Sequence, residues 1–360
     1  MESVWEKESQ RPHFDTLKGN KSTDVLIIGG GIAGILCAYK LKEAGVDCML
    51  VEAADICGGI TKNTTAKITL AHGLIYDKMI SRFGKERAGL YVRAQSEAIK
   101  EYARLCRGIS CDFEISDSYV YSLDNSRIVE NEVNVLNSLG VRAEFTTDLE
   151  IPLQTAGACL VKNQAHFNPL KFLFEIAKEL PIYEHTKVLE LMPGKAITHQ
   201  GEITAKKIII ATHFPILNKH GLYPLKLYQH RSYVIALKGA QNIKGLYVDE
   251  NDKGLSFRGY RDLLLLGGGG HRTGKKGGCW QELEEFSEQH YESAEIVGKW
   301  ATQDCMSLDD IPYIGRYSKS TTDLFVATGF NKWGMTNAMV AANILCDLVM
   351  ERENPYTAVF

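Results

Sequence analysis

The chain has 360 residues, of which 45% are hydrophobic and 24% are charged, and its formal net charge is −3. This composition is typical of a globular chain of about two domains, and the charge gives no electrostatic footprint for nucleic-acid binding. No apolar run approaches the ~20 residues of a membrane span, and the polar residues 1–7 lack the apolar core of a signal peptide. We therefore expect a cytoplasmic protein that binds neither membranes nor nucleic acid.

The first predicted structure is a βαβ unit that follows a polar lead-in over residues 1–22. Residues 24–28 form an apolar strand, an apolar-periodic helix runs to about residue 44, and residues 47–51 form a second strand.

The turn between the first strand and the helix carries Gly29, Gly31 and Gly34 at G-x-G-x-x-G spacing. The first glycine allows the tight turn, the second admits a pyrophosphate, and the third packs the helix on the strand. Glu52 ends the second strand, where its carboxylate can accept hydrogen bonds from ribose hydroxyls and would disfavour a ribose 2′-phosphate. The pattern predicts dinucleotide binding, but by itself it does not distinguish FAD from NAD.

Further along the chain, apolar periodicity and turn residues predict the remaining elements. We expect helices at 85–107, 168–180 and 280–299, a strand-rich segment at 112–160, and strands at 182–191, 196–199, 203–212, 231–237, 244–248 and 262–266. The nine cysteines show no Cys-x-x-Cys pair and no Cys/His array at metal-ligand spacing, so we expect reduced thiols and no metal site.

A second ligand-binding helix start is predicted near the C-terminus. The apolar strand 324–327 ends in Thr328-Gly329, and a short loop leads to Gly334 and an apolar helix from Met335. The first N–H groups of a helix have no internal partner, so such a start suits an anion or an electron-rich ring. This feature, joined with the buried strand that ends at Ala211-Thr212, favours a flavin.

Together these segments resemble the FAD-dependent oxidoreductases of the D-amino acid oxidase and glycine oxidase superfamily. The resemblance also covers Trp300-Ala301 and residues 312–316. It implies an α/β fold in which a Rossmann-like FAD-binding domain of the GR2 type carries an inserted antiparallel-sheet cap domain. The boundaries that we expect are 1–22 for the lead-in, 23–84, 150–215 and 312–360 for the discontinuous FAD-binding domain, and 85–149 and 216–311 for the substrate or cap domain.

The resemblance further implies non-covalent FAD. Some relatives tether FAD through a histidine in the loop after Glu52, where this chain has Lys62 and Asn63, and others use a cysteine with which Cys305 is out of register. Trp333 could pack on the flavin ring or fill the seam between domains, and the sequence does not separate these roles. The expected FAD contacts are Gly29, Gly31, Ile32, Ala33, Gly34, Glu52, Ala53, Gly59, Thr61, Thr64, Thr65, Ala66, Val188, Ala211, Thr212, Gly315, Gly329, Trp333, Gly334, Met335 and Thr336.

A closer likeness is to the subgroup that usually carries a Rieske iron–sulfur domain after the flavin part. It rests on the Trp5 lead-in and the segments 59–76, 258–261, 267–274 and 329–336. The paired Cys-x-His and Cys-x-x-His ligands of a Rieske cluster do not occur in this sequence.

Two residues are candidates for contact with a substrate. Glycine oxidases hold the substrate carboxylate with an arginine at the position that Asp304 occupies here. An aspartate would repel a carboxylate and suit a cationic amine, although a surface or capping role is the alternative. His271, in the glycine-rich segment 267–274 that we expect to form a loop over the flavin, could face the active site or be an unattached loop histidine.

The sequence therefore predicts an FAD-dependent oxidoreductase that transfers a hydride from a small amine or amino-acid-like substrate to flavin N5. One alternative is a flavin electron-transfer module that works with a separate iron–sulfur protein as its electron acceptor. Others are a flavin reductase fed by NAD(P)H and a flavin-stabilised scaffold without turnover.

Overall fold

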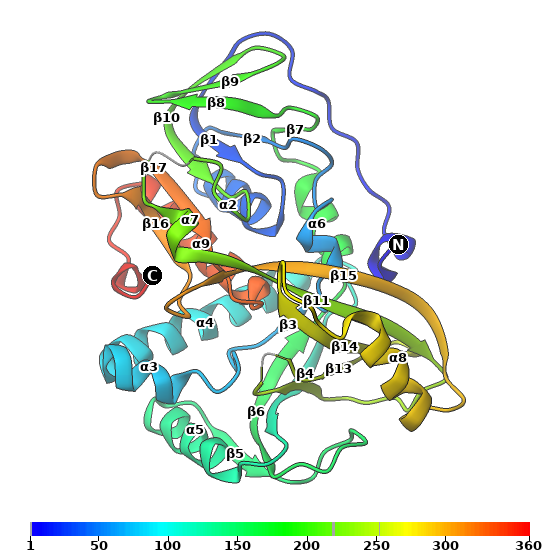
Figure 1. Ribbon diagram of the computed structural model, residues 1–360. Helices are drawn as coiled ribbons and strands as arrows, with labels where there is room; N and C mark the ends of the chain where they lie inside the picture. Colours follow the sequence, from blue (N-terminus) through cyan, green and yellow to red (C-terminus); the bar gives the residue numbers. More distant parts are fainter. Residues whose placement is uncertain (1, 218–219, 252) are drawn as a thin grey trace.

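The computed structural model describes residues 2–217, 220–251 and 253–360, and two β-sheets organise it, one above the other in Figure 1. The helices are α1 (Val4–Glu8), α2 (Ile32–Glu43), α3 (Tyr76–Phe83), α4 (Lys85–Cys106), α5 (Ser126–Ser138), α6 (Pro169–Ala177), α7 (Tyr223–Lys226), α8 (Cys279–His290) and α9 (Gly334–Val349), with 3-10 helices η1 (Ile60–Asn63) and η2 (Pro355–Ala358). None of the helices formed by the described residues is long and apolar enough to cross a membrane.

The upper sheet is mostly parallel. In spatial order its strands are β16 (Tyr313–Ser318), β17 (Thr321–Thr328), β10 (Glu202–Ile210), β1 (Lys21–Ile28), β2 (Cys48–Val51) and β7 (Ile182–Tyr183), with the hairpin β8 (Val188–Met192) and β9 (Lys195–Thr198) attached to β10. The strands from β17 to β7 run parallel, and β16 and β9 are antiparallel to their neighbours. Continuous apolar runs form the central strands because both faces are buried, with α2 and α9 packed together beside the sheet.

The lower sheet is almost entirely antiparallel. Its order is β15 (Glu295–Ser307), β11 (Leu227–Lys238), β14 (Leu263–Arg272), β13 (Ser256–Tyr260), β12 (Leu246–Asp249), β4 (Glu114–Ser122), β6 (Gly157–His166) and β3 (Lys67–Ile68), with β5 (Ala143–Thr146) beside β6. Only the pair β12–β4 is parallel among the described strands of this sheet. The predicted combination of a parallel-sheet fold with a second antiparallel sheet is confirmed.

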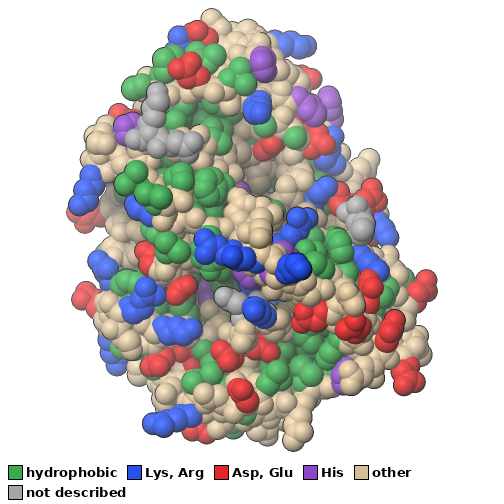
Figure 2. Space-filling model, in the orientation of Figure 1, with side chains coloured by type: hydrophobic (Ala, Val, Ile, Leu, Met, Phe, Trp, Pro, Cys, Tyr) green, Lys and Arg blue, Asp and Glu red, His purple; other side chains and the backbone are tan. Residues whose placement is uncertain are grey.

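The largest apolar cluster joins the two halves. It contains residues of α2, α4 and α9 together with Trp5 from the lead-in and Trp300 from β15, both of which are buried. In the view of Figure 2, Lys and Arg side chains gather across the middle of the face, at the level where β11 and β15 cross in Figure 1. The two sheets therefore share one core, and positive side chains lie over their junction.

Two local predictions were wrong, the helix at 280–299 and the glycine-rich loop at 267–274. The helix expected at 280–299 ends at His290, because residues 295–307 form β15, in which Ile296 pairs with Leu237 of β11. The segment 112–160, expected to be mixed and strand-rich, contains β4, β5 and the start of β6. It also contains α5, which Asn125 caps by accepting a hydrogen bond from the Ile128 N–H.

The glycine run expected to form a loop lies within β14 instead, between β11 and β13. Gly269 is needed in this run because its φ is +61° and a Cβ there would lie 2.1 Å from the Cys279 carbonyl oxygen.

The domain boundaries stay a prediction. By sheet membership, β3 and β6 belong to the lower sheet, although their residues fall within the ranges expected for the FAD-binding domain.

Candidate active site

A cavity of about 830 Å³ lies where the carboxyl ends of β1, β2, β10 and β17 face the lower sheet. Ligand pockets range over roughly 300–1,000 Å³, so this cavity has room for a large ligand. In open parallel sheets the crevice at the carboxyl ends of the strands is the usual binding position.

The glycine fingerprint forms the turn that its spacing predicts. Gly29 has φ +114°, and a Cβ there would lie 2.5 Å from the Ala211 carbonyl oxygen. A Cβ on Gly34 would lie 1.9 Å from the Gly29 carbonyl oxygen, so α2 can approach β1 only with glycine at this position. Gly31 lines the cavity, where a Cβ would lie 3.3 Å from Thr61 Oγ1. Two of these glycines therefore serve the backbone geometry, and the third faces the ligand space.

Two polar side chains are fixed beside this turn. Glu52 accepts hydrogen bonds from the N–H groups of Gly30 (2.6 Å) and Ala54 (2.9 Å), which hold its carboxylate at the cavity. The Thr61 hydroxyl, on η1, accepts a hydrogen bond from the Ile32 N–H at 3.1 Å at the start of α2. The glycine turn, the carboxylate and the helix start are the parts that a dinucleotide requires, so these residues fit FAD.

Two indoles hold the next part of the cavity wall. Trp5 Nε1 donates to the carbonyl of Thr64 at 2.7 Å, and Trp300 Nε1 donates to the carbonyl of Asn63 at 3.1 Å. Both tryptophans are fully or almost fully buried. Elements at opposite ends of the chain thus fix two successive carbonyls, those of the last residue of η1 and of the residue that follows it.

A buried arginine fixes the third carbonyl. Arg258, on β13, donates to the carbonyl of Thr65, and its second terminal nitrogen donates to the Phe167 carbonyl at 3.0 Å and to His166 Nδ1 at 2.9 Å. Burial lowers the pKa of Arg258 to about 9. The guanidinium carbon also lies 5.1 Å from the centroid of the Trp5 ring. Three side chains therefore hold the three successive carbonyls of residues 63–65.

His72 contacts the first turn of α9 through Thr336 and also contacts Trp333, the residue before that helix. The His72 ring stacks on Trp333 with centroids 4.9 Å apart and planes inclined by 15°. Its Nδ1 lies 2.7 Å from Tyr91 Oη and its Nε2 lies 2.9 Å from Thr336 Oγ1. Burial lowers the pKa of His72 to about 3, so the ring is neutral and acts as a hydrogen-bonding support. Trp333 lines the cavity as well, and its contact with the flavin ring stays a prediction.

Asp304 lies in the cavity wall on β15, paired in register with His230 of β11. Burial raises the pKa of Asp304 to about 6, while the positive charge of Lys332 opposes that shift. The carboxylate is therefore charged at neutral pH but poorly solvated, which favours a cationic ligand.

Most of the expected FAD contacts come together at this cavity. The residues that line it are Gly29, Gly31, Ile32, Ala33, Glu52, Ala53, Gly59, Thr61, Thr64, Thr65, Val188, Ala211, Thr212, Gly329, Trp333, Gly334 and Met335. Gly34, Ala66, Gly315 and Thr336 are not among its described lining residues. His271 is not among them either: its Nε2 lies 3.1 Å from Tyr233 Oη, and its catalytic role stays a prediction.

Sequence reasoning missed several cavity residues, among them Lys67, His72 and Asp249. Lys67 and His72 belong to the segment that carried the family resemblance, which was the only signal for them. Nothing local in the sequence shows that a lysine will be buried or that a histidine will stack on a residue 261 positions away.

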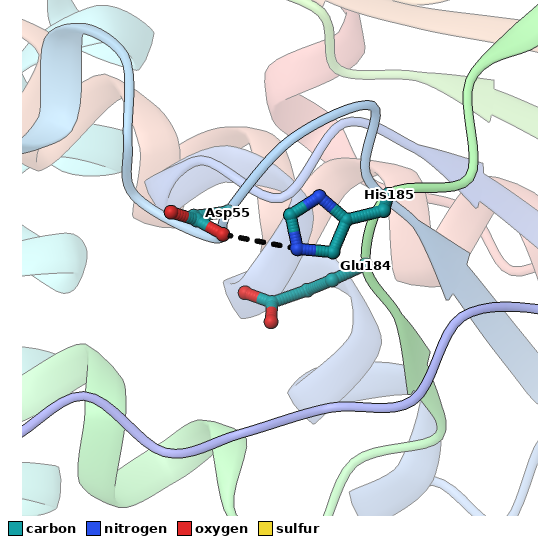
Figure 3. A group of neighbouring side chains, drawn as sticks. All are labelled: Asp55, Glu184 and His185. Carbon is teal, nitrogen blue, oxygen red and sulfur yellow. Dashed lines mark ion pairs between the residues drawn. The ribbon is translucent and has the colours of Figure 1, made fainter.

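A group of side chains near the cavity could suggest a metal site (Figure 3). His185 Nε2 lies 3.3 Å from Asp55 Oδ1, and Glu184 lies close to both. The guanidinium of Arg11 pairs with Asp55 and lies 3.6 Å from Glu184, and its hydrogen bond lowers the pKa of Asp55. Arg11 thus supplies the positive charge in this group and ties the lead-in to the ends of β2 and β7.

Comparisons with known proteins agree with this geometry. The model of the DAO family, described as FAD dependent oxidoreductase, matches residues 24–348. A Bacillus subtilis protein named "Putative Rieske 2Fe-2S iron-sulfur protein YhfW" is 34% identical, over 100% of this chain and 75% of the relative. Gamma-glutamylputrescine oxidoreductase of Escherichia coli is 23% identical, over 93% of this chain and 85% of the relative.

Among solved structures, glycine oxidase from Geobacillus kaustophilus superposes with a TM-score of 0.78 at 16% identity, over 93% of this chain and 96% of that chain. At this identity the likeness supports the fold. The family model covers both the fingerprint at β1 and the α9 start that together frame the cavity, so the chain belongs to the DAO family of FAD-dependent oxidoreductases.

Proposed function

We propose that this chain binds a small amine as its ammonium ion and oxidises it. After the ammonium has released one proton to solvent, hydride transfer from the carbon beside the neutral nitrogen to N5 of a non-covalently held FAD would give the iminium product. The observation that carries the proposal is Asp304 in the cavity wall. FAD supplies the electron sink for the hydride.

Named residues would hold the cofactor. Gly31 and the start of α2 would receive the pyrophosphate and Glu52 the ribose. Residues 63–65 and the first turn of α9 would flank the ring. The free N–H groups at the start of α9 would stabilise negative charge on the ring.

Asp304 would bind the substrate ammonium. A carboxylate in a poorly solvated wall gains more from an opposite charge than it would in water, because the effective dielectric constant is lower. The same charge would disfavour a substrate carboxylate at this position. The name of the E. coli relative, which gives gamma-glutamylputrescine as what it acts on, agrees with an amine substrate.

The floor of the cavity leaves room for the substrate. Thr302 and Ser232 pair across β15 and β11, and Ser256 and Gly267 pair across β13 and β14, and all four line the cavity. Small and hydroxyl-bearing side chains in neighbouring strands make a shallow polar surface that would orient an amine by hydrogen bonds.

Reversal of the charge at Asp304 tests the proposal. Asp304→Arg should weaken reduction of the flavin by amines and improve reduction by carboxylate-bearing amino acids, measured as anaerobic bleaching rates. Glu250→Arg reverses the charge of another acid that lines the cavity, so it is the matched control and should keep the preference for amines. An unchanged preference in Asp304→Arg would contradict the assigned role.

A further inference from the structure

Lys67 is a buried lysine in the wall of the flavin cavity. It lies on β3, is 8% exposed, and donates a hydrogen bond from Nζ to Thr65 Oγ1 at 3.3 Å. Among the described residues, the charged group that acts on Lys67 is the guanidinium of Arg258 rather than a carboxylate. A buried ammonium with a second cation nearby is costly, because neither water nor a counterion compensates its charge.

The neighbours of Lys67 on other strands do not supply that compensation. His166, its register partner on β6, is neutral, since its Nδ1 accepts from Arg258 and burial lowers its pKa to about 3. Glu114 of β4 lies 3.8 Å from His166 Nε2, and its side chain is 66% exposed. Glu114 and Asp112 both act on Arg258, and the Asp112 side chain is 25% exposed. Arg258 itself is fully buried. The basic cluster therefore has no buried acid among these neighbours.

Two other titratable groups that line the cavity have pKa values far from neutrality, and Asp304, with a pKa of about 6, stays charged between pH 7.5 and pH 9. Burial lowers the pKa of His72 to about 3 and raises the pKa of the Tyr91 hydroxyl. For Lys67, burial and the charge of Arg258 lower the pKa to about 7. Above that pH Lys67 is mostly uncharged, and a new negative charge in the cavity would draw a proton to it.

We propose that Lys67 takes up one proton when the bound flavin becomes negatively charged on reduction. A hydride brings two electrons and one proton to the flavin and leaves it with one negative charge. The second proton, from solvent or from a substrate ammonium, goes to the Lys67 amine, and the resulting ammonium balances the charge. This inference rests on FAD binding alone and does not depend on the identity of the substrate.

The midpoint potential of the bound FAD between about pH 7.5 and pH 9 tests the proposal. The protein is photoreduced in the presence of reference dyes, so no substrate enters the experiment. For a two-electron couple, each proton taken up changes the reduction equilibrium tenfold per pH unit, or about 30 mV. In the wild type the equilibrium constant for flavin reduction should change a hundredfold per pH unit, because two protons are taken up. In Lys67→Met it should change tenfold per pH unit, because only one proton is taken up.

Two further variants keep the result interpretable. Lys67→Arg retains length and a permanent charge, and it should also show the tenfold change even if Lys67→Met fails to bind FAD. Lys78→Met removes an exposed lysine from the same cavity and should keep the hundredfold change. A tenfold change in the wild type, or a hundredfold change in both Lys67 variants, would overturn the proposal. Failure of amine oxidation leaves this measurement intact, so the two proposals are separable.

Discussion

The indole nitrogen of Trp5 lies 2.7 Å from the carbonyl oxygen of Thr64, a residue 59 positions further along the chain. Through this bond the short helix α1 in the lead-in takes part in the cavity wall. The lead-in is therefore a structural part of the cavity wall rather than a loose extension.

We predict that Trp5→Phe weakens FAD binding. Loss of one buried hydrogen bond costs about 1 kcal/mol, which corresponds to a roughly fivefold higher dissociation constant. Titration of apoprotein with FAD, followed by quenching of flavin fluorescence, measures the change. Tyr223→Phe is the control, because it removes a bond from the Tyr223 hydroxyl to the Tyr317 carbonyl, away from residues 63–65. This variant should bind FAD with the wild-type affinity. Equal affinities of the wild type and Trp5→Phe for FAD would show that the Trp5 indole does not position residues 63–65 for the cofactor.

We predict that Gly34→Ala disrupts the junction of β1 and α2. The new Cβ would lie 1.9 Å from the Gly29 carbonyl oxygen, so the helix must move away from the strand. Overpacking of this kind costs about 1–3 kcal/mol, and we expect a loss of at least that free energy of unfolding together with loss of FAD. Denaturant unfolding measures it. Gly108→Ala is the control, because a Cβ there meets nothing within 4 Å. Similar stabilities for the two variants would contradict the packing role.

We predict a pH dependence of amine binding that is set by Asp304. Burial raises the pKa of Asp304 to about 6, so the carboxylate is charged above that pH and becomes neutral below it. The dissociation constant for n-butylamine, read from the flavin spectrum, should be constant above pH 7 and rise about tenfold per pH unit below pH 6. Asp304→Asn should give weak binding with no such inflection. An inflection that persists in Asp304→Asn would assign the titration to another group.

The same raised pKa predicts an effect on stability. A carboxyl whose pKa is higher in the folded than in the unfolded protein stabilises the fold at low pH, and this contribution is lost as the pH rises to about 6. Asp304→Asn should therefore increase the free energy of unfolding of the apoprotein at pH 8 by about 1–2 kcal/mol, after allowance for partial exposure. Below pH 4 the gain should vanish. A gain of equal size at both pH values would point to packing rather than charge.

The elements that could be predicted are those whose signal is local. The fingerprint at Gly29–Gly34, the strand end at Ala211 and the helix start at Gly334 each combine an apolar run with a glycine or cap, so their positions follow from short-range physics. The glycine run in β14 was predicted to be a loop. It is a strand because it pairs with β11 and β13, which lie elsewhere in the sequence.

The hydrogen bonds that hold residues 63–65 could not be predicted either, because they join residues that lie far apart in the sequence. The bond from Trp300 to the Asn63 carbonyl joins residues 237 positions apart, and the bond from Arg258 to the Thr65 carbonyl spans 193. The burial of Lys67 depends on the same tertiary arrangement. Residue types at single positions carry no signal for such contacts, whereas the segments that we expect to contact the cofactor carried one.

Anaerobic bleaching of the FAD-reconstituted protein tests the central proposal most directly. Flavin absorbance is followed after mixing with small primary and secondary amines, with amino acids, or with NADH and NADPH. We predict rapid bleaching by at least one cationic amine, slower bleaching by amino acids, and none by the nicotinamides. Absence of flavin bands after reconstitution, or bleaching by nicotinamides alone, would contradict it.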